Sequence, residues 1–354
     1  MQSKNRTLTE DEMWHAFLNK SSEYEGIFYT GVTSTGIFCR PTCSARKPLR
    51  ENTQFFKTKS AALHAGYRPC QRCKPMHEHG DVPALVEKLR NMIEGDPATR
   101  VREHDLQAMG IEPTTARRQF QRYFGMSFHA YQRARRMGSA LLTVKKGINM
   151  LDTQLEHGFE SSSGFREAFA KVFGTPPSKS QTVHCLLARW IETPLGAMLA
   201  LADDAGLHVM DFVDRRGLER EILRLRTQTG YVIVPGTHAV LDQAEREISA
   251  YFAGRHTIFR TPMAPRGTDF QRAVWAQLLQ IPPGETRSYA DIAKRIGQPQ
   301  AVRAVARANG DNFRAIMIPC HRVIGSDGSL TGYGGGLARK AWLLEHERAL
   351  RLSA

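Results

Sequence analysis

With 354 residues, 41% of them hydrophobic, the chain is long enough for roughly two or three domains that each bury a core of their own. It contains no apolar run long enough to cross a bilayer, and its polar N-terminus is neither a signal peptide nor a transit sequence. We therefore expect a cytoplasmic protein without a membrane segment. The net charge is +14. Basic side chains outnumber acidic ones by 5 over residues 1–80, by 4 over 81–182 and by 5 over 183–354. This even distribution indicates that every part contacts a polyanion.

Four of the six cysteines form two close pairs near the N-terminus. Three residues separate Cys39 from Cys43, two separate Cys70 from Cys73, and both pairs lie in segments rich in proline and arginine that suit ligand loops. In a reducing compartment such cysteines are more often metal ligands or reactive thiols than disulfides. The spacing predicts one structural Zn²⁺ bound by four thiolates.

The sequence around these cysteines resembles the N-terminal domain of the Ada methylation-response regulators over about residues 10–78. The matching stretches are Gly36–Arg46, Arg50–Asn52 and Arg68–Cys73. Because a zinc-bound thiolate stays deprotonated and nucleophilic at neutral pH, the resemblance implies that Cys39 accepts a methyl group from a methylphosphotriester in DNA. Nearby cations would contact flanking phosphates, although each could instead be a solvated surface charge: Arg46, Lys47, Arg68 and Arg72.

Two helix-turn-helix patterns follow in residues 81–182. A helix over about 83–94 leads to a first unit over about 106–125, in which proline opens the second helix and glycine ends it. A long helix over about 128–146 joins it to a second unit over about 158–174. The pattern Phe-x3-Phe-Gly occurs in both units. The segment resembles the DNA-binding domain of AraC/XylS-type activators, and the plain alternative is an unspecialised helical linker.

The helix over 114–124 has the layout of a recognition helix for the major groove of DNA. Ala116, Phe120 and Phe124 form its apolar stripe at helical spacing. The side chains expected to face DNA are Thr114, Thr115, Arg117, Arg118, Gln121 and Arg122.

Both units depart from the pattern of that family. Residues 153–157 read Thr-Gln-Leu-Glu-His where small apolar residues are usual, and Glu112 replaces a small capping residue in the first unit. Polar side chains at a helix contact destabilise it unless they are paired. We therefore expect the second unit to be less rigid or less sequence-specific, and the sequence leaves open whether it still supports activation.

The remaining chain predicts a small α/β unit over 183–265 and a helical unit over 266–354. A hairpin with its turn at 194–196 and a strand over 206–212 carry no signature of chemistry, and Cys185 is interpreted as structural. Helices are expected near 216–226, 239–252, 269–279, 289–296 and 301–308.

Cys320 stands between Pro319 and His321, with Arg322 next. A thiol reacts as its thiolate, and basic or cationic neighbours raise the thiolate fraction at neutral pH. A bare Cys-His pair is nevertheless more often a core thiol beside an unrelated histidine, since adjacent strand residues point to opposite faces. A hydrolase with a Cys-His dyad would carry its histidine elsewhere in the sequence. The dipeptide alone leaves the choice between a reactive and a structural thiol open.

The surrounding motifs resemble the O6-alkylguanine-DNA alkyltransferases over about residues 187–350. The chain carries Phe270-Gln271, Pro282-x-Gly284-Glu285-Thr286, Arg303-Ala304-Val305, Ile318-Pro319-Cys320-His321-Arg322-Val323 and Gly332-Tyr333-x-Gly335-Gly336. The resemblance implies that Cys320 takes a methyl group from O6-methylguanine, and also from O4-methylthymine, once per molecule. His321 would remove the thiol proton through a water and Glu347 would orient His321, although Glu347 alone could be a solvated helix charge.

Further roles follow from the same resemblance. Asn312 would hold the turn before the thiol, and the Tyr289 hydroxyl would protonate the guanine anion that leaves. Because O6 lies within the duplex stack, the target nucleotide must flip out, and Arg303 would fill the gap. Tyr333 and Gly335 would line the pocket that receives the base.

Together these patterns predict a multidomain α+β/α protein. Its expected parts are an α/β zinc domain over 1–80, an all-α double helix-turn-helix domain over 81–182, and an alkyltransferase with an α/β subdomain over 183–265 and a helical catalytic subdomain over 266–354. We expect it to repair double-stranded DNA stoichiometrically and, once methylated on Cys39, to activate promoters of the adaptive response with RNA polymerase. The alternative is a DNA-binding transcription factor with non-catalytic thiol domains. The promoter sequence, the alkyl-group size and the oligomeric state stay open.

Overall fold

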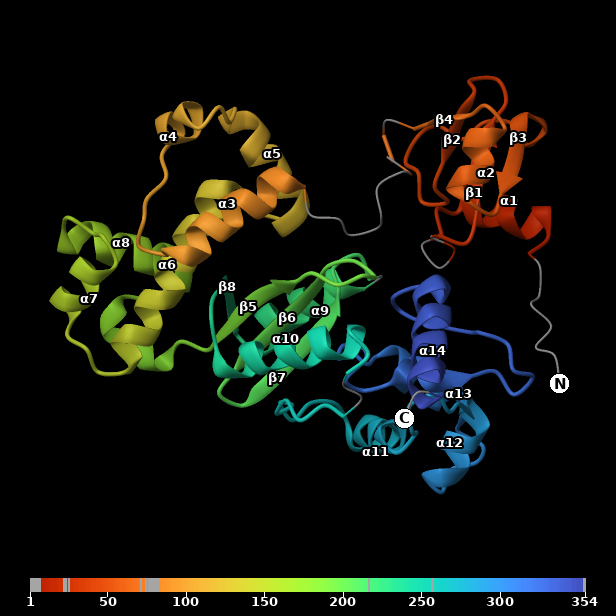
Figure 1. Cartoon of the computed structure of the whole chain (residues 1–354). Helices are drawn as coiled ribbons and strands as arrows, with labels where there is room; N and C mark the ends of the chain where they lie inside the picture. The colour runs from red at the N-terminus through yellow and green to blue at the C-terminus, as the bar shows by residue number, and fades with distance from the viewer. Residues whose placement is uncertain are drawn as a thin grey trace.

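The structure, a computed structural model, describes residues 8–21, 24, 26–70, 72–73, 75, 83–215, 217–255 and 258–352. Figure 1 shows an N-terminal sheet region, a helical region, and a C-terminal part built from a second sheet and several helices. This multidomain mixture of helix and sheet confirms the predicted fold class. Within the described residues, no helix is long and apolar enough to span a bilayer.

The first region folds around a sheet of strand order β3-β1-β2-β4. A capping box between Thr9 and Glu12 starts its first helix. Strands β2 and β4 run parallel with Phe38 opposite Pro69, so Cys39 and Cys70, which follow these two residues, lie side by side. The elements are α1 (Glu10–Leu18), β1 (Tyr29–Val32), β2 (Ile37–Cys39), η2 (Arg50–Asn52), β3 (Thr53–Phe56), α2 (Lys59–His64) and β4 (Arg68–Pro69).

The second region is helical throughout and contains the two predicted helix-turn-helix units. Gly125 and Gly174 adopt φ of 71° and 70° just past α5 and α8, a left-handed conformation in which glycine has no Cβ penalty. The elements are α3 (Ala84–Gly95), α4 (Glu103–Ala108), α5 (Pro113–Phe124), α6 (Phe128–Lys145), α7 (Met150–Glu156), α8 (Ser162–Phe173) and η3 (Pro177–Thr182).

Three of the four polar residues predicted to weaken the second unit, Thr153, Gln154 and His157, are buried with partners, while Glu156 is exposed. Gln154 donates Nε2 to Phe159 O at 3.1 Å and accepts from Ser162 Oγ at 2.7 Å. Thr153 donates to a backbone carbonyl at 2.9 Å, and His157 Nε2 lies 3.2 Å from a threonine hydroxyl of α6. Because paired polar groups avoid most of the desolvation penalty, the structure does not support the prediction of a less rigid second unit.

The third region is a sheet of order β7-β6-β5-β8 with two helices. The sequence predicted the antiparallel strands but missed β8, a short run between two helices that pairs parallel to β5 at the sheet edge. The elements are β5 (Cys185–Ile191), β6 (Met198–Asp203), β7 (Gly206–Phe212), α9 (Leu218–Gln228), β8 (Val232–Pro235) and α10 (Ala239–Phe252).

The last region is mainly helical. Its one described strand pair is short and parallel: β10, which follows the Cys320 segment, pairs with β9. Its predicted helices are present within about two residues of their expected ends. The elements are α11 (Asp269–Leu279), β9 (Arg287–Ser288), α12 (Tyr289–Arg295), α13 (Val302–Gly310), η4 (Cys320–Arg322), β10 (Val323–Ile324) and α14 (Leu337–Leu352).

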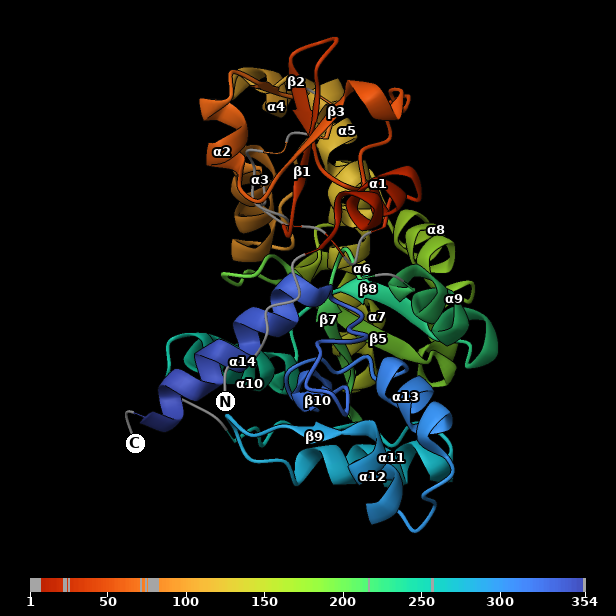
Figure 2. The same cartoon turned by 90° about the vertical axis from the view of Figure 1, so that its right-hand side faces the viewer.

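One buried cluster crosses the expected boundary between residues 182 and 183. Phe169 of α8 and Val234 of β8 both belong to it, and Figure 2 shows α6 lying beside β8. A Cβ at Gly138 would lie 2.8 Å from Val234 Cγ2, so glycine lets α6 approach the strand. Trp190 packs edge-on against Phe124 with ring centroids 4.5 Å apart. Residues 86–131 also form a buried cluster of their own, so the boundary between residues 182 and 183 stays a prediction, with one shared cluster crossing it.

Candidate functional site

The four N-terminal cysteines converge on one point. Their sulfur atoms all lie within 4.8 Å of one another, and all but the half-buried Cys73 are buried. A tetrahedral zinc ion with bonds of about 2.3 Å separates its sulfur ligands by about 3.8 Å, so the donor set fits one Zn²⁺. The backbone amides of Arg40 and Ala45 lie 3.4 Å from Cys73 Sγ and 3.5 Å from Cys43 Sγ, where N–H donation steadies thiolates. The predicted zinc site is confirmed.

The cations near this site differ in their surroundings. Arg46, Arg68 and Arg72 are exposed, as a contact to a phosphate requires. Lys47 is half-buried, because its Nζ lies 3.5 Å from the centre of the Phe17 ring and donates to the Cys43 carbonyl at 3.2 Å. Burial lowers the pKa of Lys47. Lys47 therefore braces the ligand loop, a role that sequence reasoning did not assign to it.

Helix α5 presents most of its predicted DNA-facing side chains to solvent. Thr114, Arg117, Arg118 and Gln121 are exposed and Thr115 is half-buried, while the Arg122 side chain lies outside the described residues. Gln121 Nε2 also donates to the Gly125 carbonyl at 2.8 Å and so closes the helix end. Glu112 precedes the helix without capping it through its side chain, as the sequence indicated.

The Cys320 thiol sits in a short 3₁₀ turn rather than in a strand. Cys320, His321 and Arg322 form η4 and are all buried. Neighbours in a 3₁₀ turn are about 120° apart, so the alternation that argued against a Cys-His pair does not apply. Asn312 holds the preceding turn by donating Nδ2 to Ile318 O at 2.9 Å. Burial raises the pKa of Cys320, so the thiol is mainly protonated at neutral pH and needs a base.

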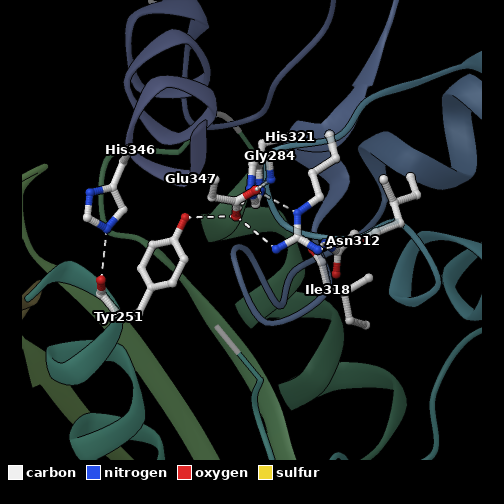
Figure 3. A network of polar contacts seen from close by, with 9 residues as sticks. Tyr251, Gly284, Asn312, Ile318, His321, His346 and Glu347 are labelled. Carbon is white, nitrogen blue, oxygen red and sulfur yellow. Dashed lines mark hydrogen bonds and ion pairs between the residues drawn. The ribbon is translucent and has the colours of Figure 1, made fainter. Parts of the chain in front are cut away.

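Behind the thiol, Glu347 is the centre of a buried network, drawn in Figure 3. Its Oε1 lies 2.8 Å from His321 Nε2, and Arg322 donates Nε and Nη2 to the two carboxylate oxygens at 2.8 Å each. Tyr251 Oη and the Gly284 amide add hydrogen bonds of 3.0 and 3.2 Å. Burial alone would raise the pKa of Glu347, but the bonds from His321 and Arg322 outweigh it and hold the pKa well below its usual range.

This network leaves one nitrogen of His321 free to act as a base. Because Nε2 faces the Glu347 carboxylate, the N–H belongs there, which makes Nδ1 the acceptor. Nδ1 is buried without a hydrogen-bond partner among the described residues. Burial lowers the pKa of His321, partly opposed by Glu347, so the ring is neutral at pH 7. His321 and Glu347 are therefore arranged as the base and the orienting acid of such a relay, with Cys320 as the preceding residue in the chain.

A cavity of about 380 Å³ opens onto the thiol, a size within the usual range for small-ligand sites. Tyr289 donates to the Thr331 carbonyl at 3.3 Å, while the buried Tyr333 hydroxyl has no partner among the described residues. The lining residues include Asp211, Arg215, Tyr289, Asn312, Cys320, Tyr333 and Gly335.

Arg303 is exposed on α13, the helix that forms one side of this cavity. It lies one turn before Ala306, which lines the cavity, and residues three apart share a helix face. The Arg303 side chain therefore stands on the cavity side of α13 and is free to approach DNA.

Sequence reasoning missed several residues of this site. Lys340 is fully buried and donates Nζ to the carbonyls of Val323 and Thr331 at 2.5 and 2.6 Å, which ties the strand after the thiol to the cavity loop. Burial lowers the pKa of Lys340 to about 8. In the sequence, Lys340 stands next to Arg339 and resembles an ordinary surface lysine. No local pattern indicates that its side chain is buried. Tyr251, Asp211 and Arg215 come from a segment without any recognisable motif.

Comparison with known proteins adds three family matches, two relatives that match over nearly the full length and others that match the C-terminal part. The matching families are described as the metal binding domain of Ada (residues 12–76), a helix-turn-helix domain (106–182) and the DNA binding domain of 6-O-methylguanine DNA methyltransferase (269–349). The bifunctional transcriptional activator/DNA repair enzyme Ada of Escherichia coli is 36% identical over 348 residues, 96% of this chain and 97% of that protein. The regulatory protein ada of Salmonella typhimurium is 33% identical over 97% of this chain and 98% of its own length. A methylated-DNA–protein-cysteine methyltransferase of Mycobacterium tuberculosis is 48% identical over 161 residues, 46% of this chain and 92% of its own length.

Proposed function

Because the chain belongs to the Ada family of transcriptional activators and DNA repair methyltransferases, we propose that it repairs methylated DNA and reports the damage to promoters. It is a methylated-DNA–protein-cysteine methyltransferase whose two acceptors are Cys320 and Cys39. Cys320 takes methyl groups from O6-methylguanine and O4-methylthymine, and Cys39 takes them from methylphosphotriesters. The observation that carries the first reaction is the buried thiol at a cavity, backed by His321 and Glu347.

The geometry supports a direct displacement at Cys320. His321 Nδ1 takes the thiol proton, directly or through one water, and Glu347 stabilises the imidazolium that forms. The thiolate attacks the methyl carbon, a C–S bond forms, the C–O6 bond breaks, and its electron pair stays on the guanine. The Tyr289 hydroxyl, on the cavity wall, supplies a proton to that anion. The product is a neutral thioether, a very poor leaving group, so each molecule acts once.

Access to the base requires nucleotide flipping. O6 is buried in the duplex stack, and extruding a nucleotide costs a few kcal/mol. Arg303 would fill the space left in the duplex, a role that its exposure on α13 supports. Asn312 keeps the turn before the thiol fixed, and Tyr333 and Gly335 form part of the wall that receives the base.

At the N-terminal site, Cys39, Cys43, Cys70 and Cys73 hold the zinc ion, which when bound keeps all four sulfurs as thiolates. The Cys39 thiolate is then the methyl acceptor. Four thiolates around Zn²⁺ carry a formal charge of −2, and methylation of one reduces it to −1. Near a phosphate lattice this loss of repulsion strengthens DNA binding, most of all at low salt. The exposed Arg46, Arg68 and Arg72 contribute attraction to the same lattice.

The middle region supplies promoter recognition. Arg117 and Arg118 of α5 would enter the major groove, which their exposure supports. In this proposal the chain acts in the cytoplasm together with RNA polymerase. The functional parts are residues 1–80, 81–182, 183–265 and 266–354, although the buried cluster at 182/183 joins the second to the third.

One experiment separates this proposal from its rival, a transcription factor with inert thiols. The full chain is incubated with DNA carrying labelled O6-methylguanine or labelled methylphosphotriesters, and the label on protein is mapped. Cys320→Ala should abolish transfer from the base only, and Cys39→Ala transfer from the backbone only. Absence of label on the unmodified protein would establish the rival. Titrating promoter DNA with the methylated and unmethylated protein at several salt concentrations tests the switch, which equal affinities would exclude.

A further inference from the structure

Tyr251 reaches Glu347 from helix α10, outside the segment that the methyltransferase family match covers. That match spans residues 269–349, whereas α10 ends at Phe252. Tyr251 is fully buried, and its Oη donates to Glu347 Oε1 at 3.0 Å. A buried phenol hydroxyl needs a hydrogen-bond partner, but nothing in its burial requires that partner to be the proposed orienting acid. The choice of partner ties this side chain to the chemistry of Cys320.

The Glu347 carboxylate receives more donors than it has lone pairs (Figure 3). Oε1 accepts from Tyr251 Oη, and also from His321 Nε2 and Arg322 Nη2 at 2.8 Å each. Oε2 accepts from Arg322 Nε at 2.8 Å and from the Gly284 amide at 3.2 Å. Two carboxylate oxygens offer about four lone-pair sites, so these donors compete. Tyr251 and His321 compete for the same oxygen.

Each donor on a carboxylate takes up part of its negative charge. Because Tyr251 binds Oε1, that oxygen attracts the His321 N–H less strongly, which destabilises the imidazolium and makes the ring a weaker base. Burial already lowers the pKa of His321, and the bond from Tyr251 acts in the same direction. The ring therefore stays neutral, as an acceptor of the Cys320 proton must be.

We propose that Tyr251 is a positioning residue of the base-repair reaction, which fixes the Glu347 carboxylate and limits the negative charge that it offers to His321. The inference rests on the proposed function of Cys320. With the Tyr251 hydroxyl in place, His321 is neutral and its Nδ1 can take the thiol proton. Without it, a larger fraction of the ring is protonated in weakly acid buffer and cannot act as a base. Tyr251 is not among the described residues that line the cavity, so it acts through Glu347 and His321.

The residue before Glu347 holds Tyr251 in place. His346 Nε2 donates to the Tyr251 carbonyl at 2.8 Å, and the two rings meet edge to face with centroids 5.2 Å apart. Neighbouring residues of α14 thus contact the backbone, the ring and the hydroxyl of one tyrosine. The orientation of the phenol is therefore set before any substrate arrives, as a positioning role requires.

The charged and titratable groups around the base and its acid come from three elements. Among the described residues, those facing His321 or Glu347 are Cys320 and Arg322 of η4, Lys340 of α14 and Tyr251 of α10. Helix α11 also packs against η4, but its charged residues, Asp269 and Arg272, are exposed and paired with each other.

The acid limb of the rate profile separates His321 from these groups. Burial lowers the pKa of Lys340 to about 8 and raises the pKa of Cys320, so both titrate on the alkaline side. Asp211 of the cavity wall, with a pKa raised by burial to about 6, has a separate ion pair that a change at Tyr251 leaves in place. A movement of the acid limb on changing Tyr251 therefore reports His321.

The test follows two readouts in the full chain: the pH dependence of single-turnover transfer from an O6-methylguanine duplex, and the NMR titration of the His321 ring, assigned by its loss in His321→Gln. Tyr251→Phe keeps the ring and removes the donor, so the acid limb and the pKa of His321 should both rise by about 0.5–1 pH unit. Tyr131→Phe is the matched control. Tyr131 is also buried and donates to an acid, Glu94, at 2.9 Å, and Arg135 binds the same carboxylate, but in the helical region. It should leave both readouts unchanged.

Site-specific incorporation of 3-fluorotyrosine at position 251 tests the same bond with the opposite sign. Fluorine makes the phenol a stronger donor with little change in shape, so the acid limb and the pKa of His321 should fall. An unmoved His321 titration in Tyr251→Phe, slower transfer at every pH without movement of the limb, or an equal shift in Tyr131→Phe would overturn the proposal. If Tyr251→Phe does not fold, the fluorotyrosine variant decides by the same criteria. Failure of the unmodified chain to label Cys320 would instead contradict the proposed function, and the His321 titration would still test the bond from Tyr251.

Discussion

Replacing Glu347 by glutamine tests the network behind the thiol most directly. The side chain keeps its shape but loses its charge, and its amide NH₂ cannot accept the bonds that one carboxylate oxygen now receives. Arg322 would then be a buried cation without its counter-charge. Removing one partner of a buried pair costs about 3–5 kcal/mol. For a domain of this size that corresponds to a fall in Tm of roughly 6–20 °C.

The same change should slow methyl transfer to Cys320. The Glu347 carboxylate fixes the proton on His321 Nε2 and leaves Nδ1 as the base. A glutamine amide can present its NH₂ to the ring and favour the other tautomer, as an asparagine does in a serine protease triad. We expect single-turnover transfer from an O6-methylguanine duplex to fall on the order of 10²–10⁴-fold. Transfer to Cys39 should be unaffected, since its ligands belong to a separate region.

Glu345→Gln is the control on the same helix. The Glu345 side chain is 79% exposed, and within the described part of the chain its one ion pair is with Arg348, at 3.8 Å. Its replacement should change stability by less than about 0.5 kcal/mol and leave transfer unaltered. Thermal unfolding and rapid-quench transfer are measured on both variants. If Glu347→Gln unfolds and reacts like Glu345→Gln, the network neither stabilises the fold nor orients the base, and the reasoning is refuted.

Three further predictions concern metal, flipping and pH. Cys43→Ser should lower the amount of zinc bound per chain, measured by metal analysis, and abolish methyl transfer to Cys39 while methyl transfer to Cys320 continues. Loss of both methyl transfers would show that the zinc site supports the fold of the whole chain. Arg303→Ala should slow repair of O6-methylguanine in duplex DNA but not of the free base, which needs no flipping; equal slowing would place Arg303 in the chemistry instead. Since burial lowers the pKa of His321, its neutral form persists below the ordinary value of about 6.5, and the transfer rate should hold through that pH and fall only in more acid buffer. A fall at or above pH 6.5 would contradict the assignment of a neutral base.

The zinc site and the helix ends were predictable because they depend on short-range geometry. Two cysteines a few residues apart can bind the same ion whatever the course of the rest of the chain. The pairing of β2 with β4 is the one long-range contact needed to bring the two cysteine pairs together. Gly125 and Gly174 mark helix ends because a left-handed residue is most easily glycine. In these cases the local sequence already contains the physical constraint.

Other features depend on partners far away in the chain and left no local pattern. Strand β8 is too short to show alternation, and it exists because β5 offers an edge. From the sequence, Gln154 is expected to destabilise the contact between the helices of the second unit. In the structure its amide pairs with the Phe159 carbonyl and the Ser162 hydroxyl. Lys47 reads as a phosphate contact, but the Phe17 ring beneath it is 30 residues earlier in the chain.

The site around the Cys320 thiol includes residues that lie outside its sequence motifs. The methyltransferase family match covers residues 269–349, which hold the proposed nucleophile, base and orienting acid. Yet Tyr251 of α10 donates to Glu347, and the Nε2 of His346, the residue before Glu347 in α14, lies 2.8 Å from the Tyr251 carbonyl, so these two contacts hold α14 against α10 at the proposed orienting acid (Figure 3). Arg215 reaches the cavity from the same α/β unit. A segment without any signature of chemistry thus sets the position of the acid and part of the cavity wall, because orienting a reactive group requires contacts on every side of it.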